Sequence, residues 1–216
     1  MRDHGNIGAD RLEIRPIEPD DKEALARGFD HLSEQSRYRR FLSPRGPLTP
    51  AELRYFTEVD HHDHEALVAV DPETQEGVGV ARYVRSRDDP QAAEMAVAVV
   101  DDWHGRGVGS RLTAALAQRA REEGISRFMA LALAENDVMM SLLKELGDVH
   151  SARARMGTVE LAVDLPQSGL GRLRRLLRAT ASGDVTVLFR LLRHVRMPAR
   201  HVAVTGRPAG RPTHDR

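Results

Sequence analysis

Three alternating glycines, at positions 105, 107 and 109, form the segment of this sequence best suited to hold a ligand. They lie between an apolar, strand-like run and an amphipathic, helix-like stretch. Glycines let the backbone turn tightly and approach a bound group closely. Their amides, together with the unpaired amides that begin a helix, favour the binding of a phosphate. The helix dipole stabilises an anion at that position by about 0.3–1 kcal/mol. The segment therefore predicts a phosphate-binding loop, with Arg106 adding positive charge.

The familiar nucleotide-binding loops have a different spacing. A dinucleotide fingerprint, G-x-G-x-x-G, would place its third glycine at position 110, which is Ser110. A P-loop needs a lysine after its last glycine, whereas Ser110 and Arg111 follow here. The residues alone thus leave two interpretations, a phosphate loop of another kind or a plain strand-to-helix turn.

The hydrophobic pattern predicts a domain in which helices and strands are interleaved. Amphipathic or capped stretches indicate helices at about 21–29, 33–41, 50–57, 108–123 and 136–146. Apolar or alternating runs indicate strands at 11–15, 66–70, 77–84, 94–100, 128–134 and a pair within 149–165, broken near Gly157. Thr49, Pro50 and Glu52 form the signature of a capping box. This order is typical of a layered α/β or α+β domain.

Composition and charge divide the chain and exclude several classes of site. The absence of cysteine excludes disulfides, thiolate zinc sites and a cysteine nucleophile, and we expect a cytoplasmic protein without a signal peptide. Residues 167–216 hold 11 arginines and two acids, while residues 1–166 hold 21 basic and 30 acidic residues. We therefore expect a disordered segment over 1–10, a folded domain over 11–166, and a basic, arginine-rich and partly helical extension over 167–216.

The glycine segment also carries a family resemblance. His104-Gly-Arg-Gly-Val-Gly-Ser110 resembles the acetyl-CoA pyrophosphate loop of the GNAT superfamily of N-acetyltransferases, whose pattern is Gln/Arg-x-x-Gly-x-Gly/Ala. Gly107 and Gly109 match its glycines, and a histidine stands at its first position. Residues 135–147 resemble the family element in which an asparagine, here Asn136, contacts the cofactor. The resemblance covers about 11–165. It implies an α/β (α+β) fold with a mixed, mostly antiparallel central sheet, a splayed strand pair and flanking helices.

This resemblance implies roles for named residues. Glu94 matches the catalytic glutamate of lysine acetyltransferases and would be the general base, and its apolar neighbours predict an apolar setting for it. Alternative roles stay open: an exposed strand-end acid for Glu94, plain core for the valines of its strand, and a helix N-cap for Asn136. No tyrosine follows Tyr83, so the tyrosine acid of many family members has no counterpart. The residues implied to bind acetyl-CoA are Val97, Val99, His104, Gly105, Arg106, Gly107, Val108, Gly109, Ser110 and Asn136.

A narrower resemblance bears on the acceptor. Residues 12–21, 38–41 with 58–64, and 93–99 are similar to bacterial protein lysine acetyltransferases, the kind that silence acetyl-CoA synthetase. This implies acetyl-CoA-dependent N-acetylation of a protein lysine by direct attack of the amine. Two alternatives remain, a small-amine N-acetyltransferase and a catalytically weak acyl-CoA-binding sensor or adaptor.

Three further features have competing interpretations. The run from His61 to His64 suggests a metal, but neighbouring residues on a strand point to opposite sides, so we expect a turn and no metal site. Arg39 and Arg40 either contact an acidic protein substrate or belong to a solvated helix face. The basic extension either packs on the acidic domain or binds an acidic partner or membrane surface. Nucleic acid is the least favoured partner, because Phe189 is the one aromatic residue of the extension.

Overall fold

A computed structural model describes residues 11–155 and 157–166 of the chain. These residues all belong to the first of two compact units, Met1–Arg175. The segment 1–10, expected to be disordered, and the basic extension 167–216 lie outside the described residues. Their predicted properties therefore stay predictions.

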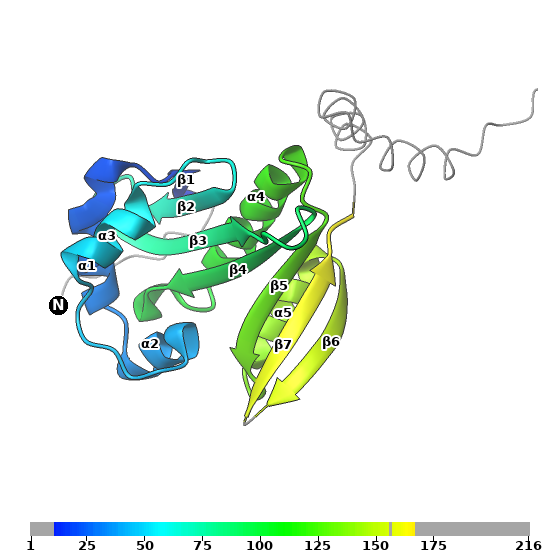
Figure 1. The fold of residues 1–216 in the computed structure, drawn as a ribbon. Coiled ribbons are helices and arrows are strands. Elements are labelled where there is room, and N and C mark those ends of the chain that lie inside the picture. The colour runs from blue at the N-terminus through cyan, green and yellow to red at the C-terminus, as the bar shows by residue number, and fades with distance from the viewer. Residues whose placement is uncertain (1–10, 156, 167–216) are drawn as a thin grey trace, which may run out of the picture. The chain divides into compact units, whose positions relative to one another are not determined.

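A seven-stranded sheet forms the centre of the domain (Figure 1). Its strands are β1 (Glu13–Pro16), β2 (His64–Val70), β3 (Gly77–Arg85), β4 (Ala92–Val99), β5 (Arg127–Leu133), β6 (Asp148–Arg155) and β7 (Thr158–Asp164). They lie in the order β1-β2-β3-β4-β5-β7-β6. The β4–β5 pair is parallel and the other neighbouring pairs are antiparallel. The mixed, mostly antiparallel sheet predicted from the sequence is therefore confirmed.

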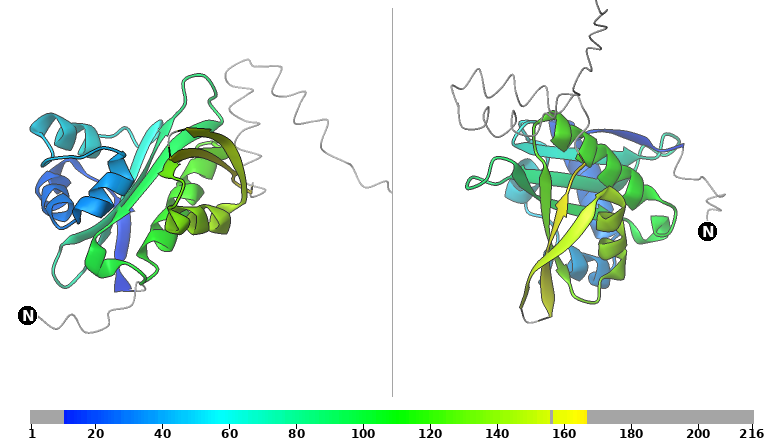
Figure 2. Two further views of the ribbon diagram at one scale, coloured as in Figure 1. Left: turned by 90° about the horizontal axis from the view of Figure 1, so that it is seen from below. Right: turned by 90° about the vertical axis from the view of Figure 1, so that its right-hand side faces the viewer.

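Helices cover both faces of this sheet (Figure 2). One face carries α1 (Lys22–Asp30), α2 (Glu34–Phe41) and α3 (Pro50–Thr57), and the other carries α4 (Val108–Glu122) and α5 (Asp137–Leu146). The predicted capping box is present at α3, since the side chain of Thr49 accepts from the N–H of Glu52 and that of Glu52 accepts from the N–H of Thr49. Short 3-10 helices, η2 (Pro19–Asp21) and η3 (Asp101–Trp103), precede α1 and α4. Among the described residues, no helix has the length and apolar character that crossing a membrane requires.

The histidine run forms a turn. Asp60 Oδ1 accepts hydrogen bonds of 2.8–2.9 Å from the three successive N–H groups at 62, 63 and 64. The rings then turn to different partners: Glu65 for His61, Glu123 for His62 and Arg82 for His64. Within 11–155 and 157–166, no group of three histidine or acidic side chains is placed to hold a metal ion.

The packing of α4 against β3 fixes where the glycine segment begins. Leu112 and Leu116 of α4 are fully buried against the sheet. Gly79 of β3 makes this close approach possible, because a Cβ there would lie 3.0 Å from Leu112 Cδ1 and 3.2 Å from the Ala98 carbonyl oxygen. The first turn of α4 is thereby held beside the end of β4.

We predict that Gly79→Ala lowers the free energy of unfolding by about 1–3 kcal/mol, because the added methyl group overfills this contact. Gly77→Ala is the matched control in the same strand, since its Cβ would meet Val68 Cγ2 at an ordinary 3.6 Å. Urea unfolding followed by circular dichroism measures both. Equal effects of the two substitutions would contradict this account of the α4 packing.

Candidate active site

A cleft of about 750 Å³ opens where β4 and β5 separate. It is large enough for an extended ligand, since small-molecule sites commonly measure roughly 300–1,000 Å³. Arg106 is the one predicted site residue that is not part of its lining. The lining contains the other ten: Glu94, Val97, Val99, His104, Gly105, Gly107, Val108, Gly109, Ser110 and Asn136.

The separation of β4 from β5 exposes main-chain amides. The parallel pairing stops at Glu94↔Met129, while β4 continues to pair with β3 as far as Gly79↔Val99. The N–H of Val100 donates to the Val78 carbonyl at 2.9 Å, toward β3. Because N–H directions alternate along a strand, those of Val97 and Val99 point away from β3, toward the cleft. They are thus placed to meet a ligand where a neighbouring strand would otherwise lie.

The glycine segment after β4 has a backbone that other residues adopt rarely. Gly105 and Gly107 have φ values of +70° and +80°, in the left-handed region, and Gly107 is the N-cap of α4. The N–H groups of the first helical turn have no acceptor within the helix. Those residues, Val108, Gly109 and Ser110, all line the cleft. Their amides and the positive end of the helix dipole suit this end of the cleft to an anion.

The side chains of His104 and Arg106 differ in where they point. His104, which departs from the family pattern, donates its Nε2 hydrogen to the Val99 carbonyl at 2.8 Å. This bond ties the glycine segment back to the end of β4. Arg106 was expected to add charge to the phosphate site, but its guanidinium lies over the ring of Trp103, 5.1 Å from the ring centre. It is stacked beside the cleft and does not line it.

Asp101 lies in η3, just before the glycine segment, and connects this part of the chain to α2. Its carboxylate accepts hydrogen bonds of 2.6 Å from both the Ser33 N–H and the Ser36 hydroxyl. Burial would raise the pKa of Asp101, but the bonds from these serines outweigh that effect and hold the pKa below its ordinary value. The carboxylate is therefore ionised at neutral pH and holds the start of α2 against the glycine segment. Sequence reasoning missed this link, because the partners are 65 to 68 positions apart.

Asn136 has the local role that the sequence suggested as an alternative. Its Oδ1 accepts from the N–H of Met139 at 3.2 Å, so it is the N-cap of α5. This bond uses one of the two acceptor positions of the oxygen and neither donor of the NH₂ group, and Asn136 also lines the cleft. The cap is confirmed, and a contact with the cofactor stays a prediction.

Glu94 stands at the point where the two strands part, and its side chain is exposed. The expectation of an apolar setting is therefore wrong. Its neighbours Ala93 and Met95 are buried, at 0 % and 3 % exposure, but adjacent residues of a strand point to opposite faces. The apolar neighbours face α4 and α5, while the Glu94 carboxylate lies on the face of α1, α2 and α3.

Other residues also line the cleft, and of those named here the sequence indicated only Arg40, as one candidate for contact with an acidic substrate. Leu131 and Val138 are 53 % and 65 % exposed and give the cleft an apolar wall. Ser36 and Arg40 reach it from α2, which is distant in sequence. Among the described residues, the hydroxyl groups that line it are serines and none is a tyrosine.

Comparison with known proteins agrees with this geometry. Residues 11–148 match the model of the acetyltransferase (GNAT) domain. The chain is 39 % identical over 153 residues to acetyltransferase Pat of Mycolicibacterium smegmatis, covering 71 % of this chain and 45 % of that protein. It is 32 % identical over 139 residues to an acetyltransferase of Pseudomonas aeruginosa, covering 63 % of this chain and 74 % of that one.

A solved structure is also similar. The crystal structure of the GNAT domain of S. lividans PAT superposes with a TM-score of 0.66 at 33 % identity, covering 71 % of this chain and 90 % of that one. This chain spans less than half the length of the Mycolicibacterium relative. The family model covers well over half of this chain, and the cleft lies within the matched region. The chain therefore belongs to the GNAT acetyltransferase family.

Proposed function

We propose that this protein transfers an acetyl group from acetyl-CoA to the side-chain amine of a protein lysine, with Glu94 as the general base. One observation carries the proposal. A single cleft joins a glycine segment suited to an anion, β4 amides beyond the end of the β4–β5 pairing, and an exposed carboxylate. Acetyl transfer to an amine needs a held thioester, a neutral amine and a donor to the oxyanion, and these three groups are suited to supply them.

The residues present fit acetyl-CoA. The amides of the glycine segment and of the first turn of α4 suit the diphosphate. The apolar wall with Leu131 and Val138 suits the aliphatic parts of the pantetheine arm, and the amides of Val97 and Val99 suit its polar groups. Acetyl-CoA supplies an acyl group activated as a thioester.

The chemistry asked of Glu94 is removal of a proton. A lysine amine has a pKa near 10.4, so at neutral pH it is almost entirely an ammonium ion and cannot attack. The carboxylate accepts its proton, directly or through one water, and the free amine forms the N–C bond as the C–S bond breaks. The amide nitrogen releases its second proton as the bond forms, and the leaving thiolate, with a pKa near 8.5 in its free form, takes up that proton through water. A β4 amide pointing at the thioester oxygen stabilises the charge that develops there.

The choice of a protein lysine rests on similarity and on access. Three segments resemble bacterial protein lysine acetyltransferases, and the relatives named Pat share 33–39 % identity with the chain. The exposed position of Glu94 is consistent with an acceptor carried on another macromolecule, because a long lysine side chain can reach it from outside.

We predict that Gly107→Ala raises the Kd for CoA by about five- to thirtyfold, because a Cβ in the left-handed region costs roughly 1–2 kcal/mol. Isothermal titration calorimetry measures the change. Gly46→Ala is the control, since nothing lies within 4 Å of a Cβ at that position. If the unmodified protein gave no heat with CoA or acetyl-CoA, the assignment of the cleft to this cofactor would fail.

We predict that Glu94→Gln lowers kcat by about 10²–10⁴-fold, the usual contribution of a general base, while the Kd for acetyl-CoA stays the same. Thiol release measures turnover, and calorimetry measures binding. Glu145→Gln is the matched control, because Glu145 also lines the cleft but lies on α5. An unchanged rate in Glu94→Gln would remove the base assignment.

We predict that this protein releases thiol from acetyl-CoA faster when the acceptor is an acetyl-CoA synthetase than when it is any of a panel of small amines. Mass spectrometry of the synthetase should find the acetyl group on a lysine. Turnover with small amines alone would favour the small-amine enzyme, and cofactor binding without any turnover would favour a sensor or adaptor.

A further inference from the structure

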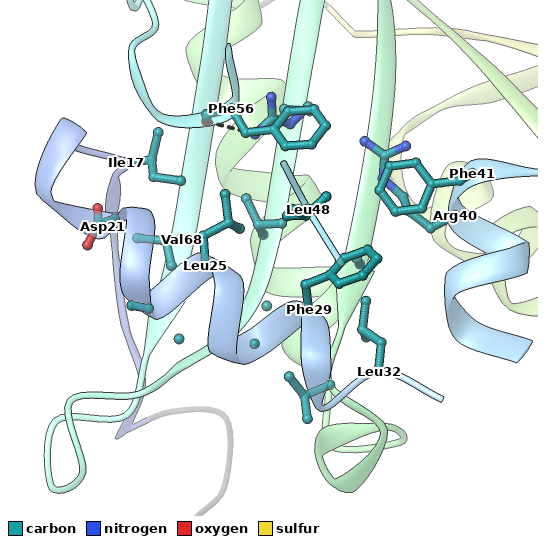
Figure 3. Close-up of a pocket in the computed structure, with 18 residues that line it drawn as sticks. Ile17, Asp21, Leu25, Phe29, Leu32, Arg40, Phe41, Leu48, Phe56 and Val68 are labelled. Atoms are coloured by element: carbon teal, nitrogen blue, oxygen red, sulfur yellow. Dashed lines mark hydrogen bonds between the residues drawn. The ribbon is translucent and has the colours of Figure 1, made fainter. Parts of the chain in front are cut away.

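Two guanidinium groups on the Glu94 face of the sheet form no ion pair with a carboxylate of the described residues. Arg40 is in the last turn of α2, and Arg82 is in β3. Both line a small apolar cavity of about 70 Å³ between α1, α3 and the sheet, and Arg40 also lines the larger cleft (Figure 3). Arg40 therefore stands at the boundary between the two.

Arg82 is satisfied by neutral groups alone. It is 6 % exposed, and it donates to the Phe56 carbonyl at 2.9 Å and to His64 Nε2 at 3.1 Å. Its guanidinium lies over the Phe56 ring, 4.4 Å from the centre. These contacts hold the side chain in place, and no carboxylate within residues 11–155 and 157–166 pairs with its positive charge.

Arg40 has still fewer partners. It lies half-buried with its guanidinium 4.8 Å from the centre of the Phe41 ring, and Figure 3 shows it reaching from α2 toward the strands. Within the part of the chain that the structure describes, the Arg40 side chain makes no hydrogen bond or ion pair. Nearby Arg45 differs, because it is paired with Glu52. Burial lowers the pKa of Arg40 to about 10. The nearby charge of Glu94 raises this pKa, and the charge of Arg45 lowers it further.

An arginine in this condition is suited to bind an anion. Burying a charge without a partner is costly, and a guanidinium presents several N–H donors that match a carboxylate in pairs. The apolar surroundings strengthen such a bond, because little water competes for it.

The positions of Arg40 and Arg82 relative to Glu94 indicate which molecule would carry the anion. Val84 pairs directly with Glu94, so Arg82, two residues earlier in the same strand, shares its face of the sheet. Glu94 also interacts electrostatically with Arg40. A lysine ammonium that approaches Glu94 thus comes near the Arg40 guanidinium, which no carboxylate of the described residues pairs with and which repels it. A carboxylate on the same acceptor would remove that repulsion.

We propose that Arg40 binds an acidic side chain of the acceptor protein, an aspartate or glutamate next to the target lysine. This inference depends on the proposed function. It makes Arg40 a specificity-determining residue for substrates in which a lysine is flanked by an acid.

The test compares two peptides that are identical except for glutamate or glutamine beside their single lysine. We expect the unmodified protein to show a kcat/KM roughly tenfold or more higher for the glutamate peptide, since a hydrogen bond to a charged group contributes about 1.5–3 kcal/mol. Arg40→Gln should bring this ratio close to one, through KM and with little change in kcat or in the KM for acetyl-CoA. Arg40→Lys, which keeps the charge but not the planar fork, should give an intermediate ratio.

The matched control is Arg54→Gln, which removes the same charge from an exposed position on α3 and should keep the preference. A ratio near one in the unmodified protein, or a full preference in Arg40→Gln, would overturn the inference and leave the lysine acceptor intact. If the protein binds acetyl-CoA and acetylates neither peptide, the lysine acceptor itself fails. If Arg40→Gln changes only the choice between acetyl-CoA and succinyl-CoA, the carboxylate belongs to the acyl donor and the inference is wrong.

Discussion

The loss of pairing between β4 and β5 after Glu94 is the constraint on which the rest of this structure depends. A buried strand normally satisfies its amides with a neighbour, because an unpaired buried N–H is costly. Here the ladder stops, and the space that opens is large enough for a ligand to take the place of the missing strand. The same break puts Glu94 at the edge of that space, so the binding and the proton transfer that we propose both depend on one irregularity in the sheet.

Three contacts hold the opening in shape. Gly79 lets α4 lie close to β3, which fixes the start of that helix beside the end of β4. His104 binds the Val99 carbonyl and fastens the glycine segment to the strand before it. Asp101 binds the first residues of α2 and places that helix along the cleft. A helix from the N-terminal part of the chain thereby becomes a wall of a site whose other parts follow it by more than 50 residues.

The charges on the two faces of β4 are arranged differently. The α4 side is apolar and buried, whereas the α1–α3 side carries Glu94, Arg82 and the neighbouring Arg40. On this side, aromatic rings lie against the guanidinium groups, and in the part of the chain that the structure describes no carboxylate pairs with either. This asymmetry separates the groups that we assign to the cofactor from those that we assign to the acceptor.

Local features of this protein could be predicted from its sequence. The Thr49–Glu52 capping box, the Asn136 cap and the order of strands and helices depend on residues within a few positions of one another, and each occurs as predicted. The glycine segment could be placed for the same reason. The sequence could not settle how side chains from distant elements meet. Adjacent alanine and methionine suggested an apolar Glu94, but the pleat of the strand sends them to the opposite face. Arg106 stacks on Trp103, a local contact that the charge of the arginine did not reveal. Whether Arg40 finds a carboxylate depends on which elements pack beside α2, and among the described residues it finds none.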